Sequence, residues 1–236
     1  MPLPRQATSA PREQRGTSAH APHRQWTPLA RALTVAGDSW TLAIAAELAP
    51  GRMRLSALRA RLADVSAGLL DRYLQRMADA GLITRSRYRE MPPRVEIELT
   101  DAGRELLPVA AALSRWALLR AWSDPGPDER VDVEALLRQV PLMLDLRPPL
   151  PDAEVELALR LPGRERRWLL DIRSGVCRAL CGASQATPAA TIAGDADAWL
   201  RAIGPQGKAS SLKLSGDRAL ARALLRALVA PRRPPG

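Results

Sequence analysis

The stretch of sequence that decides the fold is Arg52–Thr100, which reads RMRLSALRARLADVSAGLLDRYLQRMADAGLITRSRYREMPPRVEIELT. Its first part predicts a helix, because apolar residues recur there at the 3.6-residue period. These residues are Leu55, Leu58 and Leu62. Ser66 is a good N-cap for a second helix, which Gly81 ends. We expect this second helix to bury Leu69, Leu70, Tyr73, Leu74 and Met77. Two helices joined this tightly are typical of a helix-turn-helix, whose second helix can enter a major groove.

The end of the same stretch predicts a two-stranded wing. Leu82 begins a first strand, and Met91-Pro92-Pro93 turns the chain. Val95, Ile97 and Leu99 then alternate with polar residues, which is the period-2 pattern of a half-buried strand. The stretch therefore predicts a winged helix.

Arginine dominates the polar positions of this winged helix. Residues 52–94 hold ten arginines and four acidic residues. Such a charge run is usually a solvated face, but a winged helix meets phosphates with its second helix and hairpin. We expect four side chains to approach base edges: Ser66, Arg72, Gln75 and Arg76. We expect phosphate contacts from Arg52, Arg54, Ser56, Arg85, Arg87, Arg89 and Arg94.

Residues 26–122 resemble the HxlR family of bacterial winged-helix regulators. The resemblance rests on Asp38-Ser39-Trp40-Thr41-Leu42, Gly51-Arg52-Met53-Arg54-Leu55-Ser56-Ala57-Leu58, Gly81-Leu82-Ile83, Pro92-Pro93-Arg94-Val95-Glu96-Ile97 and Leu99-Thr100-Asp101-Ala102-Gly103. It implies a homodimeric regulator that binds a pseudo-palindromic DNA operator, more often as a repressor. Many members carry a redox-sensing cysteine before the proline of the first helix, and here that position is Thr27. Because threonine has no thiol, we expect no thiol sensing at this site.

Composition agrees with a polyanion partner. The chain has 236 residues and a net charge of +10, and nearly all its basic residues are arginine. A high-GC genome produces the same bias, so the distribution is more informative: the excess is +7 in residues 1–122 and +3 in residues 123–236. The sequence has no apolar run long enough to span a membrane, and it shows no export signal. We expect a cytoplasmic, nucleoid-associated protein with no membrane partner.

Several segments flank the winged helix. Residues 1–24 and 231–236 lack periodicity and predict disordered tails, and the first of these contains both histidines, His20 and His23. Residues 26–49 predict two helices, the second capped by Ser39. Thr100 or Asp101 caps a long helix to Trp122, apolar on two sides. We expect its stripe Leu106, Val109, Leu113, Trp116 and Leu119 to cover the winged-helix core. The resemblance implies dimerisation through the helices near 28–36 and 101–122.

Residues 123–131 predict a linker, and residues 132–230 predict a second domain. After a helix at residues 133–146 the periodicity changes to 2, with strands around 155–161, 168–173, 176–181, 189–193 and 212–214. Asp195 and Asp217 each cap a helix. A meander of about five strands with helices on one face predicts a two-layer α+β domain. The whole chain is thus of α+β class, with an N-terminal winged helix-turn-helix.

The second domain resembles the sterol-carrier-protein-2 type lipid-binding fold. The resemblance rests on Trp168-Leu169-Leu170-Asp171-Ile172-Arg173-Ser174-Gly175, Ala196-Asp197-Ala198-Trp199-Leu200 and Leu212-Lys213-Leu214-Ser215-Gly216-Asp217, and spans residues 133–228. It implies an apolar tunnel for an acyl or sterol-like ligand. The inward residues that would line it are Val155, Leu157, Leu159, Trp168, Leu170, Ile172, Trp199 and Leu214. The alternative is that they only form the core.

The motifs of enzymes and metal sites are missing from the sequence. Both histidines lie in the tail, and the glycines form neither a G-x-G-x-x-G nor a P-loop. Cys177 and Cys181 are spaced C-x3-C, unlike a dithiol catalyst or a zinc knuckle, and small apolar packing is the expected role. We therefore expect no catalytic residues, no metal and no cofactor.

The sequence predicts a DNA-binding repressor, acting as a homodimer, whose C-terminal domain senses a small apolar ligand. Two alternatives stay open. In the first, the C-terminal domain only joins subunits or recruits a protein. In the second, the protein is a lipid carrier.

Overall fold

The structure is a computed structural model that describes residues 26–89, 94–180, 187–205 and 207–228. The predicted tails lie outside these residues. The chain divides into two compact units, residues 1–38 and 39–236. The first unit contributes the helix α1, Pro28–Ala36, whose N-cap Thr27 accepts a hydrogen bond from the backbone N–H of Ala30. The second unit holds two hydrophobic cores.

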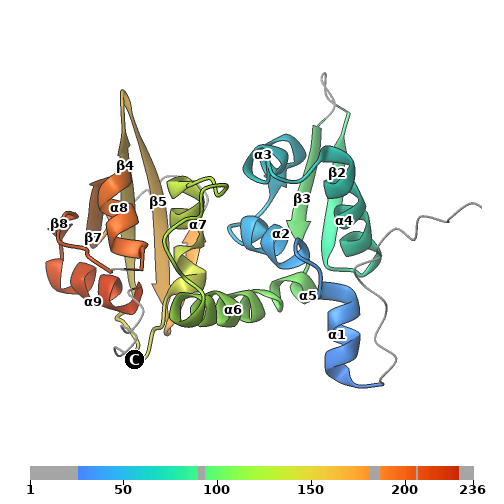
Figure 1. Ribbon diagram of the computed structural model, residues 1–236, viewed down its shortest axis with the longest axis horizontal. Coiled ribbons are helices and arrows are strands. Elements are labelled where there is room, and N and C mark those ends of the chain that lie inside the picture. The colour runs from blue at the N-terminus through green and yellow to red at the C-terminus, as the bar shows by residue number, and fades with distance from the viewer. Residues whose placement is uncertain (1–25, 90–93, 181–186, 206, 229–236) are drawn as a thin grey trace, which may run out of the picture. The chain divides into compact units, whose positions relative to one another are not determined.

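The first core of this unit belongs to a winged helix-turn-helix, as predicted. Its elements are α2 (Thr41–Leu48), β1 (Met53–Arg54), α3 (Leu55–Arg61), α4 (Ala67–Asp79), β2 (Ile83–Tyr88) and β3 (Arg94–Leu99). The three strands form an antiparallel sheet in the order β1-β3-β2. Figure 1 shows β2 and β3 as a hairpin beside α4. The short strand β1 was not predicted, and the N-cap of α2 is Trp40 rather than Ser39.

The predicted long helix after the wing is broken in two. The short helix α5 covers Asp101–Arg104 and α6 covers Leu107–Arg120. Thr100 caps α5, accepting a hydrogen bond from the N–H of Gly103 at 3.1 Å. The break follows from Pro108, which has no backbone N–H to donate and therefore suits the first turn of a new helix.

The predicted orientation of this helix was wrong for four of the five stripe residues. Leu106 packs against the winged-helix core as predicted, but the other four are 41–57% exposed, namely Val109, Leu113, Trp116 and Leu119. The opposite face is the packed one: Leu107 contacts the winged-helix core, and Leu118 contacts the second core. Periodicity identified two apolar faces but could not assign a core to either.

The second core lies between a sheet and three helices. The strands are β4 (Ala153–Leu161), β5 (Arg164–Arg173), β6 (Val176–Leu180), β7 (Ala190–Asp195) and β8 (Lys213–Gly216); the helices are α7 (Val133–Met143), α8 (Ala196–Ile203) and α9 (Arg218–Leu228). Residues of all three helices share a core with the same face of β4, β5 and β7, so the domain has two layers. Asp195 and Asp217 accept backbone hydrogen bonds as helix caps, as predicted.

The predicted meander is wrong for this sheet. The strand order is β6-β5-β4-β7-β8, in which β4 pairs in parallel with β7 and every other pair is antiparallel. The chain therefore crosses from one edge of the sheet to the far side of β4. Alternation along a strand predicts which of its residues face the core, but it does not predict which strands pair with each other.

Candidate nucleic-acid interface

The second helix of the helix-turn-helix, α4, separates an apolar face from a polar one. Leu70, Leu74 and Met77 are at most 2% exposed, because they face the first core. The polar face exposes Arg72, Gln75 and Arg76, three of the four residues that we expected at base edges. The helix starts at Ser66, whose Oγ accepts from the N–H of Leu69 at 3.4 Å. Ser66 is thus a capping residue of α4 in addition to its predicted contact with DNA.

Polar contacts hold the edges of this face. Asp71 accepts two hydrogen bonds, at 2.9 and 3.1 Å, from Arg59 of α3. Gln75 donates to Asp79 at 2.8 Å and accepts from Arg85 of β2 at 3.4 Å. These contacts hold α4 against α3 and the wing, and on contact with DNA Gln75 and Arg85 would have to share or exchange the partners they have here.

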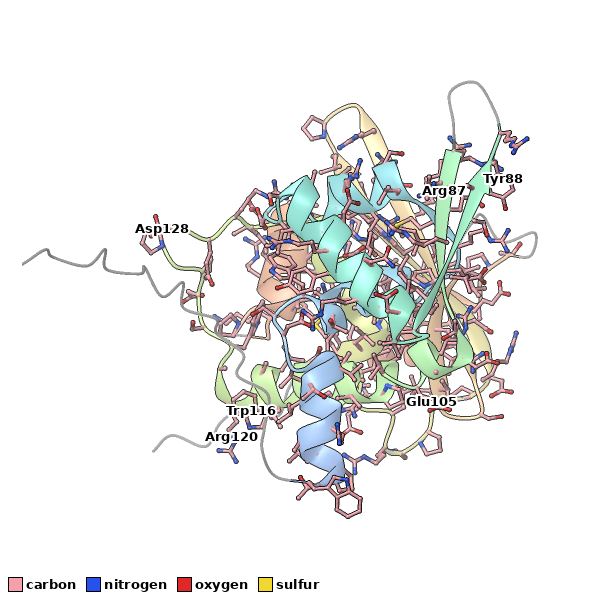
Figure 2. The ribbon with its side chains drawn as sticks, turned by 90° about the vertical axis from the view of Figure 1, so that its right-hand side faces the viewer. Arg87, Tyr88, Glu105, Trp116, Arg120 and Asp128 are labelled. Carbon is pink, nitrogen blue, oxygen red and sulfur yellow. The ribbon has the colours of Figure 1, made fainter. Side chains whose placement is uncertain are left out.

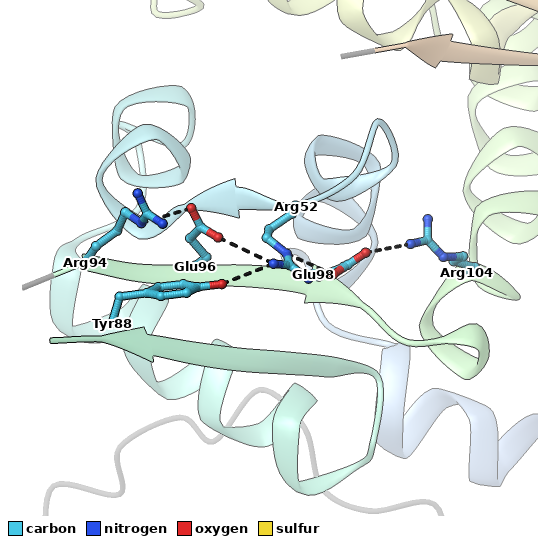
Figure 3. A network of polar contacts seen from close by, with 6 residues as sticks. All are labelled: Arg52, Tyr88, Arg94, Glu96, Glu98 and Arg104. Carbon is cyan, nitrogen blue, oxygen red and sulfur yellow. Dashed lines mark hydrogen bonds and ion pairs between the residues drawn. The ribbon is translucent and has the colours of Figure 1, made fainter. Parts of the chain in front are cut away.

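A network of charges braces the wing (Figure 3). Arg52 donates to Glu98 at 3.1 and 3.2 Å and to the hydroxyl oxygen of Tyr88 at 3.1 Å. The hydrogen bond with Glu98 is the main reason that the pKa of Arg52 is raised. Arg94 lies 3.2 Å from Glu96, and its guanidinium sits over the ring of Tyr88. Arg52 and Arg94, predicted as phosphate contacts, are therefore already engaged with carboxylates.

Four of the predicted arginines are in a different situation. Arg54, Arg72, Arg87 and Arg89 are exposed, and none forms an ion pair with another residue in the described part of the chain. Figure 2 shows Arg87 on the hairpin, close to Tyr88. Ser56 is exposed in the first turn of α3. Arg76 lies with its guanidinium 5.5 Å from the ring of Tyr73.

The partners of the engaged arginines were missed in the sequence. Glu96 and Glu98 lie two apart on β3 and therefore on one face of the strand. Arg54 of β1 pairs with Glu96 in the sheet, which brings Arg52 beside both carboxylates. In the sequence, these partners were indicated only by the alternation of acidic residues along β3, which pairs with the basic segment that holds Arg52 and Arg54.

The residues predicted to line a ligand tunnel belong mostly to the core of the second domain. Six of them, Val155, Leu157, Leu159, Leu170, Ile172 and Trp199, are at most 1% exposed. The indole N–H of Trp199 donates to the carbonyl of Ala158 at 3.0 Å. Trp168 and Leu214 are only partly buried and line separate surface pockets.

No group of three or more His, Cys, Asp or Glu that could hold a metal occurs in the described part of the chain. None of the described helices is long and apolar enough to cross a membrane.

Comparison with known proteins identifies the N-terminal half. Residues 35–124 match the model of the HxlR-like helix-turn-helix family. An HTH-type transcriptional regulator of Methanothermobacter thermautotrophicus is 35% identical over 80 residues, which are 34% of this chain and 61% of that protein. YvaP, an HTH-type transcriptional regulator of Bacillus subtilis, is 32% identical over 96 residues, which are 41% of this chain and 87% of YvaP. The chain therefore belongs to the HxlR-like helix-turn-helix family, whose members are DNA-binding transcriptional regulators and not enzymes.

Proposed function

We propose that this protein is a repressor that binds a pseudo-palindromic operator as a homodimer in the cytoplasm, with α4 in the major groove. The observation that carries the proposal is the exposed polar face of α4, together with the exposed arginines Arg54, Arg72, Arg87 and Arg89, none of which forms an ion pair with another described residue. An arginine can donate two hydrogen bonds to O6 and N7 of guanine, which no other base pair presents in the same way. Arg72 and Arg76 are therefore the proposed guanine contacts.

The remaining arginines divide into two groups by their partners. Arg54, Arg87 and Arg89 are free to neutralise phosphates, because they lack carboxylate partners among the described residues. Arg52, Arg85 and Arg94 support the shape of the wing through Glu98, Gln75 and Glu96. We propose that this second group also reaches phosphates, but more weakly, since each must share its charge with an acceptor already in place.

Dimerisation is supported by apolar surface that neither core covers. Leu29 of α1 is 69% exposed, and Trp116 of α6 is 57% exposed. Large apolar patches on a soluble protein mark association sites. A dimer built through α1 and α6 would present two α4 helices to half-sites about 34 Å apart.

We further propose that the C-terminal domain is a sensor of the sterol-carrier-protein-2 type. Two observations support this proposal: the domain has a hydrophobic core of its own, and hydrogen bonds join it to the N-terminal half of the chain. Glu47 of α2 accepts from Arg138 of α7 at 3.0 Å, and the indole N–H of Trp122 donates to the carbonyl of Ile203 at 3.0 Å. A ligand that alters this core can change the affinity for DNA only as far as it binds one conformation better than the other.

Selection from random DNA by the full-length protein, followed by binding to the selected operator, tests the proposal. Arg72→Ala should weaken operator binding by roughly 10- to 100-fold, about 1–3 kcal/mol, while leaving binding to unrelated DNA nearly unchanged. Arg178→Ala, which removes an exposed arginine from β6, is the matched control and should bind like the wild type. Enrichment of no sequence, or equal losses in both variants, would refute operator recognition by α4.

A further inference from the structure

A pocket of about 790 Å³ lies in the C-terminal domain beside β8 and α9. Its apolar wall includes Leu212 and Leu214, and its charged wall consists of Lys213, Arg218, Arg222 and Arg226. The volume is that of a site for a small organic molecule. The pocket is distinct from the core residues expected to line a tunnel, of which it contains only Leu214.

The three arginines form one row because they follow each other at four-residue steps along α9. The opposite face of the helix buries Leu220, Leu224 and Leu228. Like charges at this spacing repel each other and weaken a helix. An anion bound beside the row would relieve this repulsion. Lys213 adds a fourth positive charge from the neighbouring strand.

These cations lack anionic partners in the described part of the chain. The lining contains no aspartate or glutamate, and none of the four residues forms an ion pair with another described residue. The adjacent acid, Asp217, is used otherwise: it accepts hydrogen bonds from the N–H groups of Ala219 and Leu220 at 2.9 and 3.0 Å. The pocket therefore combines an uncompensated positive wall with an apolar one.

We propose that this pocket binds a small amphiphilic anion, in which an apolar body carries one carboxylate or phosphate group. The guanidinium groups would form bidentate, charge-assisted hydrogen bonds with the anionic group. Leu212 and Leu214 would cover the apolar body of this ligand. A nucleic-acid backbone has no such apolar body, so it would leave the leucine wall without a contact. Binding at this pocket is independent of DNA, whereas any effect of that binding on the operator rests on the proposed function.

Calorimetric titration of the full-length protein tests the site, with decanoate, decyl phosphate, decanol and inorganic phosphate as probes. We expect saturable binding of decanoate or decyl phosphate, and at least tenfold weaker binding of decanol and inorganic phosphate. Arg222→Gln combined with Arg226→Gln should weaken binding of the anion by at least about tenfold. Lys213→Gln, on a different element, should weaken it in the same direction. The matched control combines Arg160→Gln with Arg178→Gln, which removes two exposed arginines outside the pocket.

Three results would overturn the proposal: no saturable binding of either anion, equal binding of decanol and decanoate, or equal losses in the pocket and control variants. Operator affinity of each variant without probe is measured in parallel. If the pocket variants lose DNA affinity and no probe binds, the arginine row contacts DNA and the pocket proposal fails. If decanoate binds as expected while the wild type selects no operator, the pocket stands and the proposed regulatory function fails.

Discussion

At the scale of single residues, partners rather than exposure decide what an arginine can do. Arg52 and Arg87 are both exposed, yet Arg52 bonds Glu98 and Tyr88 while Arg87 has no ion-pair partner among the described residues. Arg87→Ala should therefore lower affinity for all DNA sequences alike and reduce the salt slope by about two for a dimer, one per subunit. Fluorescence anisotropy on operator and random DNA checks this. A sequence-dependent loss would instead place Arg87 at a base.

Cys177 offers a second test at this scale. Burial, with a smaller contribution from Asp171, raises the pKa of its thiol to about 12. Because the thiolate is the reactive form, Cys177 should react with iodoacetamide far more slowly at pH 8 than a free thiol with a pKa of about 8.5. Mass spectrometry of a Cys181→Ser variant isolates this thiol, and denaturant should restore ordinary reactivity. Fast labelling of the folded protein would show that this thiol is more accessible than the structure indicates.

At the scale of elements, Glu47 joins three helices. It is 4% exposed on α2 and forms ion pairs with Arg61 of α3 at 3.2 Å and Arg138 of α7 at 3.0 Å. Glu47→Ala leaves the mostly buried Arg138 without its carboxylate, so it should lower the free energy of unfolding by about 3 kcal/mol. Urea denaturation followed by circular dichroism measures the loss. The control Arg167→Ala breaks exposed pairs on β5 and should cost less than about 1 kcal/mol. Equal losses would mean that the Glu47 contacts contribute no more than surface ones.

The exposed face of α6 gives another prediction at this scale. Trp116→Glu places a charge within the apolar surface that we propose as a dimer contact, and it should convert the dimer to a monomer because an unpaired charge is costly to bury. Light scattering after size exclusion measures the mass. Ser211→Glu, at an exposed position in the second domain, should leave the mass unchanged. A wild-type monomer would refute the proposed dimer.

At the scale of the whole molecule, the charge distribution sets how salt acts on DNA binding. Outside α4, Arg54, Arg87 and Arg89 form no ion pair with another described residue. Three such arginines per subunit, hence six in a dimer, predict a slope of about −5 or steeper in log affinity against log salt concentration. Titrations between 50 and 200 mM salt measure the slope. A slope near −1 would mean that these arginines do not contact phosphates.

The extent to which sequence predicted this molecule depended on how local each feature is. The caps at Ser66, Asp195 and Asp217 were predicted because a cap is a contact between residues two or three positions apart. The pairing of Arg52 with Glu98 spans 46 positions and depends on the register of β1 against β3, which no spacing reveals. The exposed face of α6 and the parallel pairing of β7 with β4 likewise depend on which surfaces the rest of the chain leaves uncovered.

The helix α6 contacts both cores, because Leu107 packs into one and Leu118 into the other. At a rise of 1.5 Å per residue, its 14 residues make a rod roughly 21 Å long. Such a rod acts as a lever arm: each degree of rotation at one end moves the other end by roughly 0.4 Å over that length. Trp116, in the proposed dimer face, lies on this arm between the two anchored ends. A small rotation of the C-terminal core would therefore change the relative orientation of the two subunits in the proposed dimer.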